Sequence, residues 1–257
     1  MTQSTSRSGL AWVTGGATGI GLAAARALGR AGYAVAISGR RQDKIDEALA
    51  QLQAEGVSAS GIALDVADAQ AVERAAQQLQ DAHGAIDVLV ASAGTNVPKR
   101  YWRDLKAEDF ARVSRINLEG VANGVCAVLP GMRAAGTGTI IVVSSWAGWR
   151  YLTFTGAAYG ATKMGLGPLV ESINDQEGSH GIRATMVCPG EVATPILRAR
   201  PSPPPEEDIA RMLKPEDVGD AIAYIAKAPA HVCINELVIS PTWNRIYLGA
   251  PDLVPAR

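Results

Sequence analysis

The chain has 257 residues, enough for one large hydrophobic core and short for two separate ones. Lys and Arg number 24 against 25 Asp and Glu, so no strong field of one sign attracts nucleic acid or an anionic membrane. The three cysteines are scattered, the amino terminus has no apolar signal stretch, and no apolar run is long enough to span a membrane. We therefore expect one cytoplasmic domain over 1–257, with no nucleic-acid or membrane partner.

Short apolar runs alternate with longer amphipathic or alanine-rich stretches along almost the whole chain. The runs are rich in β-branched residues, as buried parallel strands are, and the stretches between them have the length of helices. The predicted strands are 10–14, 34–38, 58–64, 86–91, 139–144, 183–187 and 236–240. The predicted helices are 19–31, 42–54, 68–82, 107–134, 157–178 and 215–227. This alternation predicts an α/β fold in three layers, a doubly wound parallel sheet of about seven strands with helices on both faces.

A glycine-rich turn follows the first predicted strand. Gly15, Gly19 and Gly21 lie between that strand and the alanine-rich stretch 22–30. Glycine permits positive φ and close approach of the backbone to a ligand, and the free N–H groups at a helix start bind a phosphate. In the first strand–helix–strand unit, this turn predicts the dinucleotide site of a Rossmann fold.

The end of the second predicted strand bears on which dinucleotide is bound. A site that prefers NAD usually places Asp or Glu there to bind the ribose hydroxyls, whereas this chain has Arg40 and Arg41. A guanidinium binds a 2′-phosphate bidentately, so NADP is favoured. NAD stays open, because the turn has no additional basic residue at Ala17 or Thr18 and both arginines also suit an exposed helix start.

Tyr159 and Lys163 are candidates for proton transfer. They lie four residues apart in a predicted helix, so their side chains share one face. A nearby ammonium lowers the pKa of a phenol toward the range that general acid–base catalysis needs. The preceding strand ends in Ser144-Ser145, and Asn117 lies inside a predicted helix, where Asn is unfavourable. The four-residue spacing occurs often by chance, so its meaning depends on these neighbouring features.

From about residue 9 to 240, the chain resembles the classical short-chain dehydrogenases/reductases. The resemblance rests on T-G-x-x-x-G-x-G at 14–21, Asn117, Ser-Ser-x-Ala-Gly at 144–148, Tyr-x-x-x-Lys at 159–163 and P-G-x-V-x-T at 189–194. It departs from the family at 91–94, where Ala-Ser-Ala-Gly replaces Asn-Asn-Ala-Gly, and in a slightly longer interval between Ser145 and Tyr159. The segment 230–242 is similar to the ending of the NADP-dependent 3-hydroxy acid and serine dehydrogenases.

The resemblance implies a role for each motif residue. Tyr159 transfers the hydroxyl proton, as base in oxidation and acid in reduction, while Lys163 lowers the Tyr159 pKa and binds the nicotinamide ribose. Ser145, with Ser144 as the alternative, hydrogen-bonds the reacting oxygen, and Asn117 positions a water. The residues implied to hold the cofactor are Gly15, Thr18, Gly19, Ile20, Gly21, Arg40, Arg41, Asp65, Val66, Ala93, Gly94, Tyr159, Lys163, Pro189, Gly190, Val192 and Thr194.

Aromatic residues predict the character of the substrate. Trp146, Trp149 and Phe154 crowd the interval between Ser145 and Tyr159, and Trp243 lies in the predicted tail at 241–257, so a bulky or ring-bearing substrate is expected. Packing of some rings at a subunit interface is the alternative. Residues 191–214, with the proline-rich segment 198–207, are predicted to form a lid, with a plain surface connection as the alternative, and 1–8 are predicted to be flexible.

The function predicted on these grounds is hydride transfer between a nicotinamide cofactor, with NADP favoured, and a secondary alcohol or ketone. The alternatives are an NAD-dependent dehydrogenase of a small hydroxy acid or polyol, an epimerase or dehydratase of related fold, and a non-catalytic dinucleotide sensor. The resemblance implies a homo-oligomer, a tetramer or dimer. No metal is expected, because the three histidines lack metal-ligand spacing.

Overall fold

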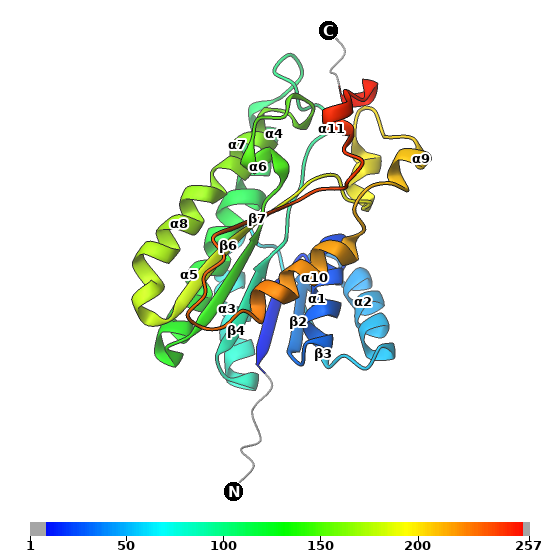
Figure 1. Cartoon of the computed structure of the whole chain (residues 1–257). Helices are drawn as coiled ribbons and strands as arrows, with labels where there is room; N and C mark the ends of the chain where they lie inside the picture. The colour runs from blue at the N-terminus through cyan, green and yellow to red at the C-terminus, as the bar shows by residue number, and fades with distance from the viewer. Residues whose placement is uncertain (1–8, 254–257) are drawn as a thin grey trace, which may run out of the picture.

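Seven parallel strands form one sheet in a computed structural model that describes residues 9–253, apart from the side chains of 198 and 199. Their order is β3-β2-β1-β4-β5-β6-β7, which is the predicted doubly wound sheet (Figure 1). The strands are β1 (Leu10–Thr14), β2 (Ala34–Gly39), β3 (Ala59–Ala63), β4 (Ile86–Ala91), β5 (Gly138–Val143), β6 (Ile182–Pro189) and β7 (Glu236–Ile239). The prediction for 1–8, and the part of the predicted tail after 253, lie outside the described residues.

Helices cover both faces of the sheet. On one face pack α1 (Gly19–Arg30), α2 (Gln42–Ala54) and α10 (Pro215–Ala226). On the other pack α3 (Ala69–His83), α5 (Gly120–Ala135) and α8 (Leu166–Glu177), with α4 (Ala107–Ser114) and α7 (Ala157–Met164) near their ends. The short helices are α6 (Trp146–Trp149), α9 (Glu206–Ile209) and α11 (Arg245–Leu248), and single 3-10 turns span Thr153–Thr155, Gly178–His180, Pro195–Ala199 and Pro251–Leu253.

The core has two large apolar clusters, one on each face of the sheet, and a small third cluster of Val97, Val113 and Ala158. Successive residues of β1 alternate between the two large clusters: Leu10 and Trp12 belong to one cluster, and Ala11 and Val13 belong to the other. All five residues of β1 are buried. Burial on both faces explains why the central strands read as continuous apolar runs rather than as alternating ones.

Two predicted helices are interrupted in the structure. The prediction 107–134 is divided into α4 and α5 by a turn of π-helix at Arg115–Glu119, and the prediction 157–178 is divided into α7 and α8 at Gly165. Inserted π-turns occur frequently at functional sites, and this one contains Asn117. Helical periodicity does not reveal such an insertion, because the pattern on either side continues.

The carboxyl ends of the strands all meet at one edge of the sheet, the upper edge in Figure 1. Beyond that edge lie α9 and α11, which come from the late part of the chain. This is where an open α/β sheet binds its ligand, next to the point at which the strand order reverses between β1 and β4. Among the described residues, no helix is long and apolar enough to span a bilayer.

Candidate active site

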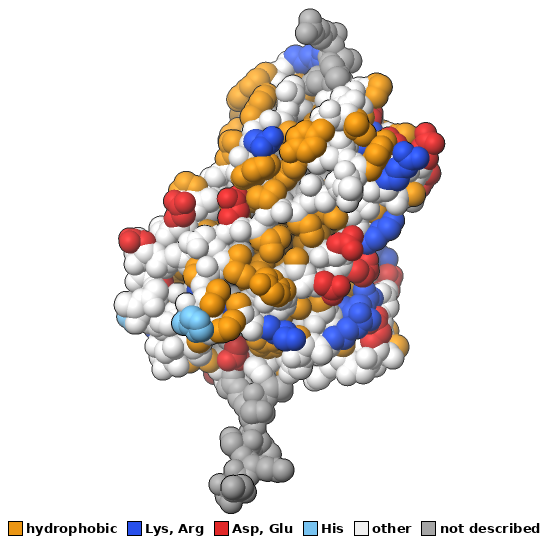
Figure 2. Space-filling model, in the orientation of Figure 1, with side chains coloured by type: hydrophobic (Ala, Val, Ile, Leu, Met, Phe, Trp, Pro, Cys, Tyr) orange, Lys and Arg blue, Asp and Glu red, His pale blue; other side chains and the backbone are white. Residues whose placement is uncertain are grey.

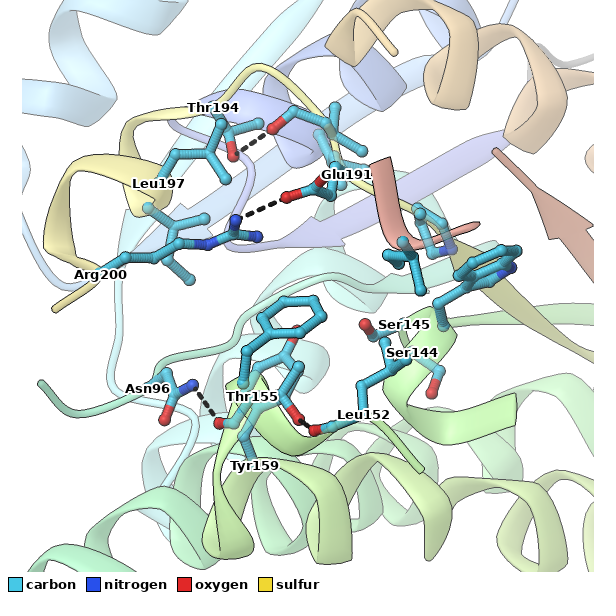
Figure 3. Close-up of a pocket in the computed structure, with 18 of the residues that line it drawn as sticks. Asn96, Ser144, Ser145, Leu152, Thr155, Tyr159, Glu191, Thr194, Leu197 and Arg200 are labelled. Carbon is cyan, nitrogen blue, oxygen red and sulfur yellow. Dashed lines mark hydrogen bonds and ion pairs between the residues drawn. The ribbon is translucent and has the colours of Figure 1, made fainter. Parts of the chain in front are cut away.

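Two pockets open at the carboxyl edge of the sheet. The first, called the glycine-turn pocket, is lined by Gly15, Ala17, Thr18, Gly39, Arg40, Arg41, Lys44, Leu64, Asp65, Val66, Ala93, Gly94, Thr95 and Ile116. The second, called the Tyr159 pocket, has Ser144, Ser145 and Tyr159 in one wall and residues from Pro189 to Arg200 in the other (Figure 3). Most of the predicted catalytic and cofactor residues line one of these two pockets, whereas Gly19, Gly21, Asn117 and Lys163 line neither.

The turn after β1 cannot hold larger residues at its glycines. Gly15 has a φ of +68°, and a Cβ added there would lie 2.8 Å from the backbone of Ala93. A Cβ on Gly21 would lie 2.2 Å from the Gly15 carbonyl oxygen. Gly19 has a φ of +55°, and a Cβ on it would lie 3.3 Å from the Thr194 methyl group. Without side chains at these positions, a ligand can come close to the backbone N–H groups at the first turn of α1. Such a site suits the phosphates of a dinucleotide.

The glycine-turn pocket has a cationic rim. Arg40 and Arg41 are exposed at the end of β2, and Lys44, from the first turn of α2, also lines the pocket. Lys44 lies 2.7 Å from the Glu47 carboxylate. Sequence reasoning missed Lys44, although its position three residues after Arg41 in a predicted helix indicated that it could lie near the strand end. Asp65 also lines this pocket, and its Oδ1 accepts a hydrogen bond from the Ala67 N–H at 3.0 Å.

Asn117 fixes the loop that follows β4. It is fully buried, its Oδ1 accepts from the Thr95 N–H at 2.8 Å, and its Nδ2 donates to the Thr95 carbonyl at 2.9 Å. A Cβ added to Gly94 would lie 3.6 Å from both Asn117 Oδ1 and Lys163 Nζ. Asn117 therefore ties the π-turn to the loop between the two pockets and lies beside Lys163. Ser92, which replaces a family asparagine, donates its backbone N–H to the Thr14 carbonyl at 3.2 Å.

The two serines after β5 have different environments. The Ser144 hydroxyl is buried and donates to the Lys163 carbonyl at 3.0 Å. The Ser145 hydroxyl caps α6 by accepting from the Ala147 N–H at 3.1 Å, and it lines the same pocket as Tyr159. Of the two serines, Ser145 is the one whose hydroxyl acts to lower the pKa of Tyr159.

Tyr159 and Lys163 lie on the same face of α7, as the spacing predicted. Lys163 is buried, its Nζ donates to the Val143 carbonyl at 2.8 Å, and it lies 5.8 Å from the centre of the Tyr159 ring. Burial lowers the pKa of Lys163 from 10.5 to about 8. Burial raises the pKa of Tyr159, while the Ser145 hydroxyl and the charges of Arg200 and Arg100 act in the opposite direction.

Charged residues in the Tyr159 pocket escaped the sequence analysis. Arg100, from the loop after β4, is 5% exposed, and the Arg200 side chain is 16% exposed. Glu191 follows β6, and its Oε1 lies 2.6 Å from Arg200 Nη1 (Figure 3). Arg200 belongs to the segment predicted as a lid, which also contributes Ile196 and Leu197 to the pocket. Nothing in the local sequence distinguishes Arg100 or Arg200 from a surface arginine.

The predicted aromatic residues fall into two groups. Trp146 and Phe154 line the Tyr159 pocket. Trp149 is outside its lining, is 39% exposed and packs 5.7 Å from Trp146, with the Arg150 guanidinium over its ring. Trp243 is also outside the lining and packs against the guanidinium of Arg211 at 4.8 Å. Apolar residues that the aromatic pattern did not indicate, Leu152 and Ile246 among them, complete the wall.

Residues 10–204, more than half of the chain, match the family model described as short chain dehydrogenase. Among curated relatives, dehydrogenase/reductase SDR family member 4 of Oryctolagus cuniculus is 31% identical over 90% of this chain and 91% of its own length. Cis-4-hydroxycyclohexanecarboxylate dehydrogenase of Sinomonas cyclohexanicum is 34% identical over 89% of this chain and 93% of its own. Glycine betaine reductase ATRR of Emericella nidulans is 32% identical over 90% of this chain, which spans only 18% of that protein.

Solved structures of dehydrogenases and reductases have the same fold as this chain. An alcohol dehydrogenase from Thermococcus sibiricus, complexed with 5-hydroxy-NADP, has a TM-score of 0.81 and 30% identity over 92% of this chain and 98% of its own. A variant of actinorhodin polyketide ketoreductase with NADPH has a TM-score of 0.84 and 30% identity over 90% of this chain and 95% of its own. The serine dehydrogenase of Escherichia coli has a TM-score of 0.76 and 30% identity over 90% of this chain and 97% of its own.

Proposed function

This chain belongs to the short-chain dehydrogenase family, and we propose that it transfers a hydride between a nicotinamide cofactor and a secondary alcohol or ketone with a bulky or ring-bearing body. The observation that carries this proposal is that Ser145 and Tyr159 line one pocket beside the buried ammonium of Lys163, whose Nζ lies 5.8 Å from the centre of the Tyr159 ring. The lining is otherwise largely apolar, with Trp146, Phe154 and Leu197 in it, which suits a substrate of that kind.

Tyr159 is proposed to hold and move the proton at the reacting oxygen. In the direction of reduction its hydroxyl donates that proton to the carbonyl oxygen, and in oxidation its phenolate removes it from the alcohol. Ser145 and Tyr159 line the same pocket, so in this proposal the reacting oxygen lies between their hydroxyl groups and contacts both. The nicotinamide supplies the hydride or accepts it when it is bound, and the protein supplies orientation and protons.

Lys163 is proposed to favour the ionised form of Tyr159 and to bind the ribose hydroxyls of the cofactor. Its Nζ lies between the Val143 carbonyl and the loop at Gly94, on the boundary between the two pockets. Asn117 holds that loop in place through its two hydrogen bonds to Thr95. Asn117 is thus a positioning residue in this proposal, and its π-turn sets the distance between the loop and α7.

The preference for NADP rests on the rim of the glycine-turn pocket. Arg40, Arg41 and Lys44 offer three cations, and Asp65 is the sole carboxylate among the described residues that line the pocket. A 2′-phosphate gains charge-assisted hydrogen bonds at such a rim, whereas a ribose hydroxyl gains much less. The NADP analogue and NADPH named with two of the similar structures support this choice.

A panel of alicyclic and aryl ketones and alcohols, each with NAD(H) and NADP(H), tests the reaction and the cofactor together. We expect turnover with NADPH, and an Arg40→Ala/Arg41→Ala variant should raise the KM for NADPH by tenfold or more, roughly one charge-assisted contact, with little change for NADH. Arg112→Ala, an exposed arginine of α4, is the matched control. Preference of the wild type for NADH would contradict the role given to Arg40 and Arg41, and lack of any turnover would contradict the reaction.

A homo-oligomer, either dimer or tetramer, is part of the same proposal. The edge strand β7 exposes Val238, and Figure 2 shows apolar side chains in a band over the face on which β7 lies. Exposed apolar bands of this kind commonly mark protein–protein contacts. Light scattering on the purified protein measures the mass, and a monomer at micromolar concentration would contradict this part of the proposal.

A further inference from the structure

A series of buried hydrogen bonds joins the loop after β4 to the helix that carries Tyr159. Thr95, in that loop, lines the glycine-turn pocket, and the next residue, Asn96, lines the Tyr159 pocket. Asn117 binds the main chain of Thr95 at both its N–H and its carbonyl. The same side chain also contacts Thr162 of α7. The loop that both pockets share is thus joined to α7 through Asn117.

The amide group of Asn117 uses all of its donors in these contacts. Its Oδ1 accepts from the Thr95 N–H at 2.8 Å, one Nδ2 proton goes to the Thr95 carbonyl at 2.9 Å, and the other faces the Thr162 hydroxyl oxygen at 3.4 Å. Asn117 is fully buried, so water cannot replace a lost partner without opening the core. Removal of the Thr162 hydroxyl therefore leaves a buried N–H group unpaired, which is costly.

The hydroxyl of Thr162 continues the connection to Tyr159. It is buried, and its oxygen lies 2.9 Å from the Ala158 carbonyl and 3.0 Å from the Tyr159 carbonyl, so it donates to the main chain of the turn that bears Tyr159. Thr and Ser hydroxyls often bond a carbonyl one turn earlier in a helix. Thr162 differs from that common case because its oxygen also accepts the Asn117 N–H, which comes from the π-turn.

Thr162 lines neither of the two pockets. Any effect of its hydroxyl on the cofactor or the substrate therefore passes through Asn117 or through the main chain of Tyr159. A β-branched side chain has a restricted χ1 angle, which keeps the oxygen between these partners. The position thus combines a fixed side chain with partners that belong to both pockets.

We propose that Thr162 is a positioning residue that fixes the cofactor loop and Tyr159 relative to each other, so that one buried hydroxyl sets both the affinity for NADP and the rate of proton transfer. A shift of the loop at Thr95 changes the wall of the glycine-turn pocket. A shift of the Tyr159 main chain moves the phenol from the reacting oxygen, and a misplacement of about 1 Å costs about a hundredfold in rate. This inference rests on the proposed hydride transfer and adds to it a residue outside both pockets.

Thr162→Val removes the hydroxyl and keeps the shape of the side chain. The NADP dissociation constant should rise about three- to tenfold, the loss of one hydrogen bond. For a ketone that the wild type reduces, kcat should fall about ten- to a hundredfold, while KM for that ketone changes by less than about threefold. Thr162→Ser keeps the hydroxyl and should recover most of both losses.

Thr185→Val is the matched control. Thr185 lies in β6, is fully buried, and its hydroxyl has no hydrogen-bond partner among the described residues. The same substitution there should leave the NADP dissociation constant and kcat unchanged. A Thr162→Val protein that differs from the wild type only in its free energy of unfolding, with both constants unchanged, would overturn the proposal.

A double-mutant cycle shows whether the effect on the cofactor passes through Asn117. In an Asn117→Ala background, Thr162→Val should change the NADP dissociation constant by less than about twofold, because the connection is already broken. An effect as large as the one in the wild-type background would overturn the role given to this connection.

Amide exchange in the cofactor-free protein tests the connection without turnover. Asn117 Oδ1 protects the Thr95 N–H, so NMR should show exchange of this proton about three- to tenfold faster in Thr162→Val and unchanged in Thr185→Val. Unchanged exchange in Thr162→Val would overturn the connection even in a protein that reduces ketones. A wild type that reduces no ketone would instead overturn the proposed reaction, and the exchange rates would still decide the role of Thr162.

Discussion

The two pockets at the carboxyl edge of the sheet are built in opposite ways. The glycine-turn pocket depends on backbone: Gly15 lines it without a side chain, Gly21 packs directly against the Gly15 carbonyl, and Arg40 and Arg41 are exposed at its rim. The Tyr159 pocket is made by side chains from segments far apart in sequence, and two of its charged residues, Arg100 and Glu191, are buried in the wall. One pocket should therefore be damaged by adding a methyl group, and the other by removing a charge or a hydroxyl.

Tyr159→Phe should cause the largest loss of activity of all these variants, and the loss should be confined to the Tyr159 pocket. Loss of the hydroxyl removes the proposed acid and base, and such groups contribute about two to four orders of magnitude, so kcat should fall by that amount. The glycine-turn pocket does not contain Tyr159, so NADP binding measured by fluorescence titration should change by less than about threefold. Turnover at the normal rate would contradict the role given to Tyr159.

Arg245→Met tests whether the Tyr159 pocket depends on its buried charges. Arg245 is 1% exposed and lies among Glu191, Asp208 and Asp252, so its loss leaves carboxylates of like charge close together. Removing one partner from a buried ion pair costs about 3–5 kcal/mol, and we expect a loss of that order in the free energy of unfolding by urea.

Arg245→Met should also affect the Tyr159 pocket without affecting the glycine-turn pocket. Glu191 and Arg200 lose their anchor, so the KM for substrate should rise while the NADP dissociation constant stays nearly constant. Arg150→Met, at an exposed arginine beside Trp149, is the control for loss of an ordinary arginine. An Arg245→Met protein as stable as the wild type would show that the cluster does not hold this part of the fold.

The contrast also explains what the sequence could predict. The order of strands and helices, the sheet and the glycine turn follow from local patterns, because each rests on residues close together in the chain. Tyr159, Lys163, Ser145 and Asn117 were found by resemblance to a family whose motifs are equally local. Arg100 and Arg200 are 100 residues apart and meet only through the tertiary fold, so no local pattern indicated them. The π-turn at Asn117 was missed for a related reason, because the side chain of Asn117 binds Thr95, which lies 22 residues away in the chain.

Gly21→Ala should damage the glycine-turn pocket and leave the other intact. An added Cβ would lie 2.2 Å from the Gly15 carbonyl oxygen, so the turn must shift, at a cost of about 1–3 kcal/mol in the free energy of unfolding. The dissociation constant for NADP should rise at least tenfold, roughly the loss of one good contact. Gly167→Ala is the matched control: it lies in α8, where the nearest atom would be Met186 at 3.7 Å, and should be neutral or slightly stabilising. An unchanged NADP affinity in Gly21→Ala would contradict the role given to this turn in cofactor binding.

Lys163 lies on the boundary between the pockets. The smallest effect that we expect is a dependence of the free energy of unfolding on pH that comes from this residue. Burial lowers its pKa to about 8, whereas the unfolded chain keeps the ordinary value of 10.5. Between those values the unfolded state binds more protons than the folded state, so stability from this group rises with pH. Below about 8 both states are protonated, and burial of the ammonium is a constant cost.

The measurement is the free energy of unfolding of wild type minus that of Lys163→Met, by urea denaturation of the cofactor-free protein. This difference should increase by about 1 kcal/mol for each pH unit between pH 8 and 10.5 and be flat below pH 8. The exposed Lys227, replaced by Met, should give a difference that is flat throughout. A flat difference for Lys163 as well would mean that its charge is not desolvated. The boundary between the pockets would then be wet, and the ammonium could not act on Tyr159 with the strength that a dry site gives it.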